Sequence, residues 1–239
     1  MRELRGNIVI KIGGSLLFTD HYKINATKIS EFCSIIKSNM DFDRLIIVCG
    51  GGLIAREYIN IIRSFTSNET LCDIFGIEIS RINSKLIITF LKESAYPLVP
   101  KSMNELSKAL LFDKIIVMGG LQPGQSTTTV ATEVAEFINA THIIILTDVA
   151  GIYDRDPKKF PEAKLFSKLN YNELHTLILK SKDDRQAAAG EYRIFDLASL
   201  QILKRSNLEA VIMSGRDLNE FAKFWRGKKD ILRTVISNK

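Results

Sequence analysis

The sequence predicts an α/β fold in which helices cover both faces of a mostly parallel sheet. Short apolar runs alternate with longer amphipathic segments, and three of the apolar runs end in glycines. We expect strands at about residues 7–13, 44–49, 114–119, 142–148, 209–214 and 232–237. We expect helices at about residues 26–39, 53–65, 70–92, 103–111, 127–139, 171–180, 196–207 and 217–226.

Polar capping residues support several of the expected helix starts. Ser102 followed by Glu105 is a capping-box pattern in front of one helix. Asn170 with Glu173 makes a similar start, and Asp196 can cap the helix that follows.

The composition is ordinary for one soluble domain, which we expect to span residues 1–239. Residues 149–169 are polar and contain two prolines, so we expect a functional loop there and no domain boundary. Cys33, Cys49 and Cys72 are an odd number without close pairing, which predicts core residues in a reducing cytosol. The histidines show no ligand spacing, so no metal cage of histidine and cysteine is expected.

Charge and hydropathy argue against two classes of partner. The net charge of +6 is scattered along the chain, so no nucleic-acid partner is expected. The first residues lack an apolar signal region, and no apolar run approaches the length that spans a bilayer. We therefore expect a cytoplasmic protein without a membrane partner.

The most informative segment is Lys11-Ile12-Gly13-Gly14-Ser15, which ends the first apolar run. Glycines allow a sharp turn and close approach to a ligand, and N–H groups on such a turn can hold phosphate. A lysine on an apolar strand must direct its charge to an opening or a partner. Taken alone, the segment is equally consistent with a turn that holds no ligand.

Two further apolar runs lead into glycine loops, at residues 50–52 and 119–127. Tight packing of a strand against a helix explains any one such loop, but three together indicate a ligand at the carboxyl ends of the strands. The third loop is not a Walker ATP site, because Gln125 stands where that motif has lysine. No dinucleotide-binding motif follows a strand.

An acidic segment with Asp148, Asp154 and Asp156 follows the apolar run at residues 143–146. Carboxylates at a strand end can hold magnesium, directly or through water, or orient a lysine. The alternative is an Asx-rich turn that caps itself. Beside three glycine loops we favour a functional site, and the combination suits phosphoryl transfer without identifying the acceptor.

The order of these motifs resembles the amino-acid kinase superfamily and, within it, the archaeal type of uridylate kinase. The resemblance covers nearly the whole chain and is carried by residues 11–15, 50–56, 73–76, 81–83, 119–127 and 148–157. It implies a three-layer α/β/α sandwich with a mostly parallel sheet. It also implies an acceptor-binding lobe at about residues 1–140 and an ATP-binding lobe at about 141–239.

The resemblance implies that the chain transfers the γ-phosphoryl group of ATP to UMP with Mg²⁺, as a homohexamer in pyrimidine nucleotide biosynthesis. Lys11 would be the catalytic residue, and no protein ligand to the metal is implied. ATP would be bound by Gly13, Gly14, Ser15, Gly52, Arg56, Thr147, Asp148, Tyr153 and Asp156. UMP would be bound by Gly51, Asp73, Leu121, Gln122, Pro123, Gly124, Gln125, Ser126 and Thr127.

The chain departs from the family pattern at two positions. The family usually reads Thr-Asn-Val-Asp-Gly where this chain has Asp148 and Ala150 in place of the asparagine and the aspartate. Asp148 adds a negative charge that would repel ATP phosphates unless magnesium or a lysine lies between them. These departures bear on nucleotide affinity and metal geometry.

Alternative functions follow from related proteins. Isopentenyl phosphate kinase has a related fold, but the histidine expected after the second glycine loop is absent from residues 53–58. Kinases of amino-acid carboxylates lack the Gln-Pro-Gly-Gln-Ser-Thr segment. A non-catalytic nucleotide-binding or storage relative shares part of that segment; Lys11 argues against this alternative, and Asp148 argues for it.

Overall fold

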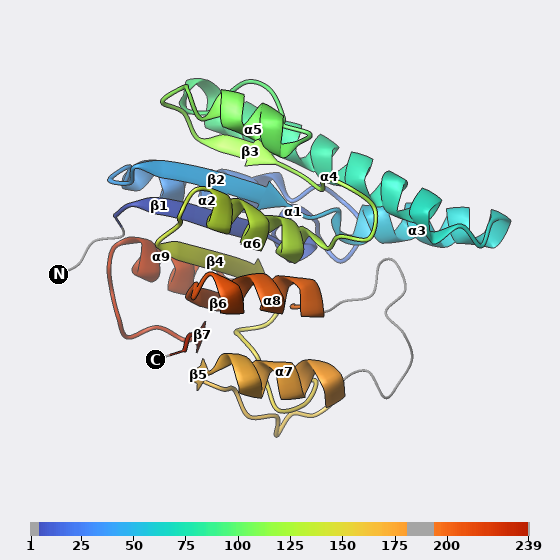
Figure 1. The fold of residues 1–239 in the computed structure, drawn as a ribbon, viewed down its shortest axis with the longest axis vertical. Helices are drawn as coiled ribbons and strands as arrows, with labels where there is room; N and C mark the ends of the chain where they lie inside the picture. Colours follow the sequence, from blue (N-terminus) through green and yellow to red (C-terminus); the bar gives the residue numbers. More distant parts are fainter. Residues whose placement is uncertain (1–4, 181–193, 239) are drawn as a thin grey trace.

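The computed structural model of the chain describes residues 5–180 and 194–238 (Figure 1). Within them, seven strands form one sheet in the order β3-β2-β1-β4-β6-β7-β5. The strands are β1 (Asn7–Ile12), β2 (Arg44–Cys49), β3 (Ile116–Met118), β4 (His142–Thr147), β5 (Lys168–Leu169), β6 (Ala210–Ser214) and β7 (Thr234–Ile236). The helices are α1 (Gly14–Leu17), α2 (Ala26–Ser38), α3 (Gly52–Phe65), α4 (Glu69–Leu91), the 3₁₀ turn η1 (Lys92–Ser94), α5 (Met103–Ala109), α6 (Thr127–Phe137), α7 (Tyr171–Lys180), α8 (Leu197–Arg205) and α9 (Asn219–Trp225).

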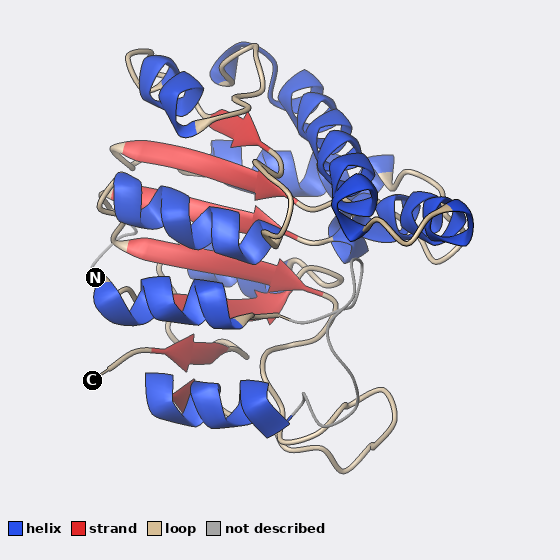
Figure 2. Cartoon of the chain, turned by 45° about the vertical axis from the view of Figure 1, so that its right-hand side comes forward, coloured by secondary structure: helices blue, strands red, loops and turns tan. Residues whose placement is uncertain are grey.

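Strand β1 lies in the middle of the parallel part of the sheet. It pairs with β2 on one side and β4 on the other, and β3 and β6 extend the parallel pairing outward. These strands are buried on both faces and rich in isoleucine and valine, as parallel strands under two layers of helices require. Figure 2 shows the arrowheads of the central strands directed toward one edge, where α3 begins.

Two separate cores confirm the predicted sandwich. Ile8, Ile10 and Ile12 of β1 face a cluster built with α2, α4 and α9, whereas Val9 faces a cluster built with α5 to α8. The alternation follows the two-residue period of a strand. Figure 1 shows α6, α7 and α8 in front of the sheet with α2 and α9 behind it. The α/β fold with a mostly parallel sheet is therefore confirmed.

The C-terminal edge of the sheet differs from the expected pattern. Strand β7 runs antiparallel to β6, and β5 pairs parallel with β7. Strand β5 and the one-turn helix α1 were not expected, because two or four residues are too few to show a periodic pattern. Residues 149–167 form the loop predicted for this region, apart from single bridge and turn contacts.

The prediction that the three cysteines are core residues is confirmed. The three cysteines are buried free thiols, and burial raises the pKa of both Cys33 and Cys49 to about 12. Trp225 is 1% exposed and contacts the rings of Phe42, before β2, and Phe221, in its own helix α9. No helix in the described part of the chain is long and apolar enough to cross a bilayer.

Candidate active site

The three predicted glycine loops follow adjacent strands of the sheet. Because β3, β2, β1 and β4 are neighbours and parallel, their carboxyl ends lie at one edge. The Gly13 N–H donates to Leu146 O at 3.0 Å, and the Gly50 N–H donates to Ile12 O at 2.9 Å. These bonds carry the strand pairing one residue into the loops and fix their starting direction.

The first and second glycine loops pack directly against each other. A Cβ atom at Gly14 would lie 2.4 Å from the Cα atom of Gly52, which no side chain can accommodate. Gly52 itself has φ +69° and would place a Cβ atom 2.8 Å from the Phe18 ring. The close packing brings the N-terminus of α3 to the end of β1, and a helix N-terminus attracts phosphate through free N–H groups and the helix dipole.

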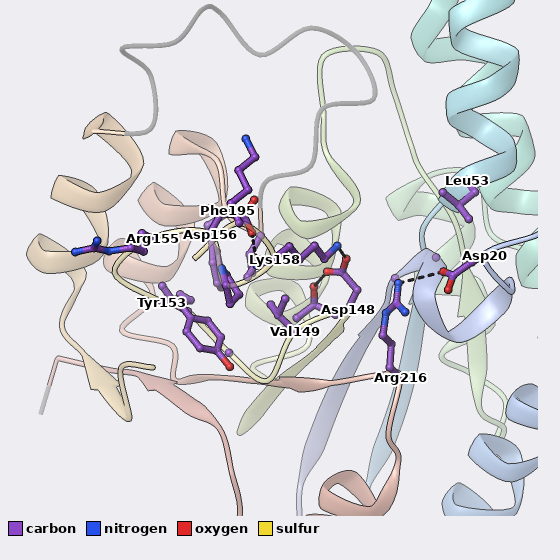
Figure 3. A pocket seen from close by; sticks show the side chains of 18 of the residues that line it. Asp20, Leu53, Asp148, Val149, Tyr153, Arg155, Asp156, Lys158, Phe195 and Arg216 are labelled. Atoms are coloured by element: carbon purple, nitrogen blue, oxygen red, sulfur yellow. Dashed lines mark hydrogen bonds and ion pairs between the residues drawn. The ribbon is translucent and has the colours of Figure 1, made fainter. Parts of the chain in front are cut away.

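A cavity of about 1200 Å³ opens beside these loops (Figure 3). One wall comes from the end of β1 and the start of α3, and the other comes from the segment after β4. Its lining includes most of the residues predicted to bind ATP: Gly13, Gly14, Arg56, Thr147, Asp148, Tyr153 and Asp156. Gly52 lies directly behind Gly14, and the Ser15 side chain lies outside the described part of the structure.

Lys11 places a positive charge at the base of this region. It lies one residue before the end of β1, opposite Val48 of β2 and Ile145 of β4, and is only 9% exposed. Burial lowers the pKa of the Lys11 ammonium from 10.5 to about 8; the Asp148 carboxylate raises it, and the Arg56 guanidinium lowers it further. A buried, poorly solvated ammonium interacts strongly with any anion that reaches it.

The acidic segment combines the two arrangements predicted for it. Asp148 forms an ion pair with Lys158, so a lysine does stand beside the carboxylate that departs from the family pattern. Asp154 accepts the Lys164 N–H at 2.8 Å, and Asp156 accepts the Lys158 N–H at 3.0 Å. Two of the three carboxylates therefore order their own loop, while Asp148 faces a cation.

Side chains of helix α4 form hydrogen bonds with the backbone of the third glycine loop. The Ser80 hydroxyl accepts the Gly120 N–H at 2.7 Å. The Arg81 guanidinium donates to Gly120 O and Leu121 O, both at 3.2 Å. Further along the loop, the Asp73 carboxylate accepts the Gly124 N–H at 2.8 Å. Gly124 has φ +80°, which glycine adopts without strain.

The same helix also holds the second glycine loop. The Asn83 side chain is 4% exposed, and its amide donates to Gly50 O at 2.8 Å and Gly51 O at 3.3 Å. Both loops that the resemblance assigns to the acceptor are thus fixed by one helix. The sequence singled out Asp73, Arg81 and Asn83 within this helix but gave no signal for Ser80.

The rest of the third loop leads into α6. The Ser126 hydroxyl accepts the Thr129 N–H at 3.0 Å and caps the helix. The Thr127 hydroxyl lies 3.5 Å from the point where a Cβ atom on Gly50 would stand, so this loop meets the second one. The Gln125 side-chain amide donates to the Glu133 carboxylate at 2.6 Å. Gln125 also lines, with Leu121 and Gln122, a second cavity of about 580 Å³.

The described residues contain no group of three or more His, Cys, Asp or Glu side chains that could hold a metal ion. A metal ion can also be bound through the phosphate oxygens of a nucleotide. Mg²⁺ commonly binds in this way, with substrate phosphates, waters and one or two carboxylates as ligands. The site therefore fits a metal that arrives with a nucleotide.

Lys158 is the functional candidate that the sequence did not indicate. A lysine on a polar loop is usually solvated, and two consecutive lysines carry no pattern that separates one from the other. Only the folded structure shows that the Lys158 ammonium donates to the Asp148 carboxylate, ten residues earlier in the chain.

Comparison with known proteins agrees with this arrangement. The sequence profile described as "Amino acid kinase family" matches residues 7–214. The uridylate kinase of Methanobrevibacter smithii is 40% identical over 222 residues, which cover 93% of this chain and 96% of that protein. The uridylate kinase of Sulfolobus acidocaldarius is 38% identical over 193 residues, covering 81% of this chain and 83% of that protein.

A solved structure gives the same result. The crystal structure of uridylate kinase from Archaeoglobus fulgidus superposes with a TM-score of 0.78 and 31% sequence identity, covering 97% of this chain and all of that chain. The profile match over residues 7–214 includes the glycine loops and the segment after β4 described above. The chain belongs to the amino acid kinase family and, within it, to the uridylate kinases.

Proposed function

We propose that the chain transfers the γ-phosphoryl group of ATP to UMP, forming ADP and UDP in pyrimidine nucleotide biosynthesis. One observation carries the proposal: a buried lysine and two packed glycine loops lie between a large cavity and a separately held third glycine loop. Such a site can place a donor and an acceptor on either side of one positive charge. The uridylate kinase relatives supply the identity of the acceptor.

The ATP side of the reaction uses the cavity next to β1 and β4. Gly13, Gly14, Ser15 and Gly52 hold the phosphates, and Arg56 stands at the junction with the acceptor. Thr147, Asp148, Tyr153 and Asp156 line the remainder of the donor site. Lys11 neutralises the phosphoryl group as it moves, because its poorly solvated ammonium gains most from a nearby anion.

The acceptor side uses the loops that α4 holds. Gly51 and Asp73 contact UMP, and residues 121–127 wrap around it. The Asp73 carboxylate and the N–H of Gly124 are already joined, so this wall of the acceptor site exists before the nucleotide binds. Preorganised contacts reduce the entropy lost when the acceptor is fixed in line with the donor.

Magnesium completes the donor in this proposal. Bound with ATP, Mg²⁺ would neutralise part of the negative charge of the phosphates. The phosphates themselves and water would supply most of its ligands, because the described residues hold no group of three or more side chains that could bind a metal ion. The chain's own contribution is to orient the phosphates and to place Lys11 beside them, with the Asp148 carboxylate favouring the charged form of the lysine.

Assembly is a further part of the proposal, because α3 and α4 expose a run of apolar side chains. Tyr58, Ile61 and Phe65 follow one stripe of α3 and are 48%, 58% and 84% exposed, and Ile74 and Ile82 of α4 are 44% and 56% exposed. Contiguous exposed apolar residues mark protein contacts. We expect these exposed side chains to contact other copies of the chain within the homohexamer, and light scattering of the pure protein measures the mass of the assembly.

Within each copy, an acceptor half at about residues 1–140 and an ATP half at about 141–239 share the site in this proposal. The cytoplasmic location and the lack of a nucleic-acid partner stay predictions from the sequence.

The test is coupled release of ADP with ATP and magnesium, measured against UMP, CMP, dUMP, AMP and isopentenyl phosphate. We expect turnover with UMP far above the other acceptors. Preference for isopentenyl phosphate would contradict the proposal. Nucleotide binding without turnover on any acceptor would identify a binding or storage protein.

Replacing Asp73 with alanine is expected to raise the KM for UMP about 10-fold or more and to change the KM for ATP little, because the substitution frees the Gly124 N–H from its partner and loosens the acceptor wall. Steady-state kinetics with each substrate varied in turn measures both values. The matched control is Asp154→Ala. In the unaltered chain the Asp154 carboxylate accepts the N–H of Lys164, in the loop on the donor side. Equal changes in both KM values for Asp73→Ala would place Asp73 outside the acceptor site.

The activity is expected to fall as the pH rises through about 8, where Lys11 loses its proton in the free protein. The protonated lysine is the form that stabilises phosphate oxygens, so kcat/KM for ATP, which reports the free enzyme, should show a descending limb. Asp148→Asn should move this limb to lower pH, because the carboxylate raises the Lys11 pKa. A limb at the same pH in this variant would assign the titration to another group.

A further inference from the structure

Asp148 is the feature of the donor cavity that phosphate binding alone does not explain. It follows β4 directly, and 13% of its side chain is exposed. A carboxylate in a cavity that receives a triphosphate repels it unless a cation stands close by. The ammonium of Lys158 forms an ion pair with Asp148 Oδ2 (Figure 3).

The loop after β4 fixes Lys158 at both its backbone and its side chain. The Lys158 N–H donates to the Asp156 carboxylate at 3.0 Å, and the Lys159 N–H donates to Asp156 O at 3.1 Å. These bonds form a turn that directs the Lys158 side chain across the cavity to Asp148. The side chain is 55% exposed and lines the same cavity as Gly13 and Gly14.

Lys11 interacts with the same carboxylate from within the sheet. It lies in β1, the neighbour of β4, and the Asp148 charge raises its pKa against the larger effect of burial. Asp148 therefore interacts with two lysines. One is buried at the end of a strand, and the other reaches in from a loop that forms part of the cavity wall.

We propose that Lys158 is a second catalytic cation, which Asp148 and Asp156 hold where the phosphoryl group passes. An ammonium carries three N–H donors, so it can contact a carboxylate and a phosphate oxygen at the same time. This assignment rests on the proposed function, because it supposes that a phosphoryl group crosses the space beside Lys11.

The transfer needs no covalent step at either lysine. The bond from the γ-phosphorus of ATP to its bridging oxygen breaks, and the electron pair stays on the oxygen of ADP. A phosphate oxygen of UMP forms the new bond to phosphorus, so ATP and UMP become ADP and UDP with all atoms and charges conserved. Lys158 and Lys11 stabilise the negative charge spread over the phosphoryl oxygens, and neither loses its proton.

Experiment can distinguish a Lys158 that contacts the phosphoryl group from a Lys158 that only neutralises Asp148. If Lys158 only neutralised Asp148, then removing both charges together would restore the activity. If Lys158 contacts the phosphoryl group, the double variant stays as slow as the variant without the lysine. The pair is therefore tested by a double-mutant cycle.

The experiment measures kcat with UMP and magnesium-ATP for Lys158→Met, Asp148→Asn and the double variant. Lys158→Met is expected to lower kcat about 100-fold, as loss of one preorganised charge contact does. The double variant is expected to match it, and Asp148→Asn should lose less, because the lysine remains. The matched control is Lys164→Met, an exposed lysine of the same loop whose bond to Asp154 uses only its backbone.

A kcat for Lys158→Met within threefold of the unaltered chain, or full recovery in the double variant, would overturn the assignment. Dissociation constants for ATP and ADP provide a readout that needs no turnover. Loss of a contact to the γ-phosphoryl group weakens ATP binding about 10-fold more than ADP binding. If the unaltered chain makes no UDP, the proposed function fails, and an equal change in both constants then removes Lys158 from the γ-phosphoryl site as well.

Discussion

Replacing Lys11 with alanine is expected to lower kcat about 1,000-fold while the affinity for UMP stays within a few fold, because the ammonium acts on the phosphoryl group in transit. In the proposed site, UMP would lie on the far side of the glycine loops, at the third loop, which Ser80 and Asp73 of α4 hold through hydrogen bonds. Steady-state kinetics gives kcat, and calorimetric titration of UMP gives the affinity. Unchanged turnover would remove Lys11 from the mechanism.

A stability measurement separates this loss from misfolding. The pKa of Lys11 is lowered in the folded protein, so near pH 7 burial of its charged form opposes folding. This unfavourable contribution to the stability of the fold becomes smaller as the pH rises from about 8 toward 10.5. In that range Lys11 is still protonated in the unfolded chain but has lost its proton in the folded protein, so raising the pH favours folding. Lys11→Met, which keeps the volume and removes the charge, is therefore expected to melt at the same or a higher temperature and to be as inactive as Lys11→Ala. A large fall in its melting temperature would show that Lys11 stabilises the fold.

The second large effect is expected for Gly14→Ala. The added methyl group would lie 2.4 Å from Gly52 Cα, which is backbone and cannot rotate away. The end of β1 and the start of α3 must therefore move apart, at a cost of about 1–3 kcal/mol in the free energy of unfolding. Because both segments hold phosphate in the proposed site, we also expect kcat/KM for ATP to fall about 100-fold.

Gly124→Ala is the matched control for this prediction. A Cβ atom at Gly124 would meet nothing within 4 Å, but the residue has φ +80°. Alanine in this left-handed backbone conformation is expected to lower the free energy of unfolding by about 1 kcal/mol. The strain is confined to the acceptor loop. Urea unfolding and kinetics with ATP varied compare the two variants. Equal effects on kcat/KM for ATP would show that the contact between the first two glycine loops has no special importance for the donor.

The convergence of the glycine loops was predictable because it depends on few facts. Runs such as residues 45–48 and 143–146 are apolar, β-branched and too short for helices, so they had to be strands. Parallel pairing then places all their carboxyl ends at one edge, whatever the strand order. The outer strands were less accessible to this reasoning, since nothing local in residues 234–236 encodes the antiparallel direction of β7.

Side-chain contacts between distant segments were the least predictable part. Ser80 and Asn83 are polar residues within a largely apolar helix, and their bonds to Gly120 and to Gly50 and Gly51 depend on where two loops lie in space. Lys158 is a similar case, because its partner Asp148 is reached only when the loop folds back. Sequence spacing identifies which residue types can do the chemistry, and tertiary packing decides which of them meet.

The central position of β1 has a consequence for how the chain reaches its native state. Ile8 of β1 pairs with Leu45 of β2 on one side and with His142 of β4 on the other. His142 is much further from Ile8 along the chain than Leu45 is, and it is synthesised after β1 and β2. Until β4 docks, one edge of β1 has no partner, and a bare strand edge invites pairing with other chains. Contacts between such distant residues are slow to form. Because β1 needs both β2 and β4 as neighbours, we expect the segments before and after β4 to fold as one cooperative unit.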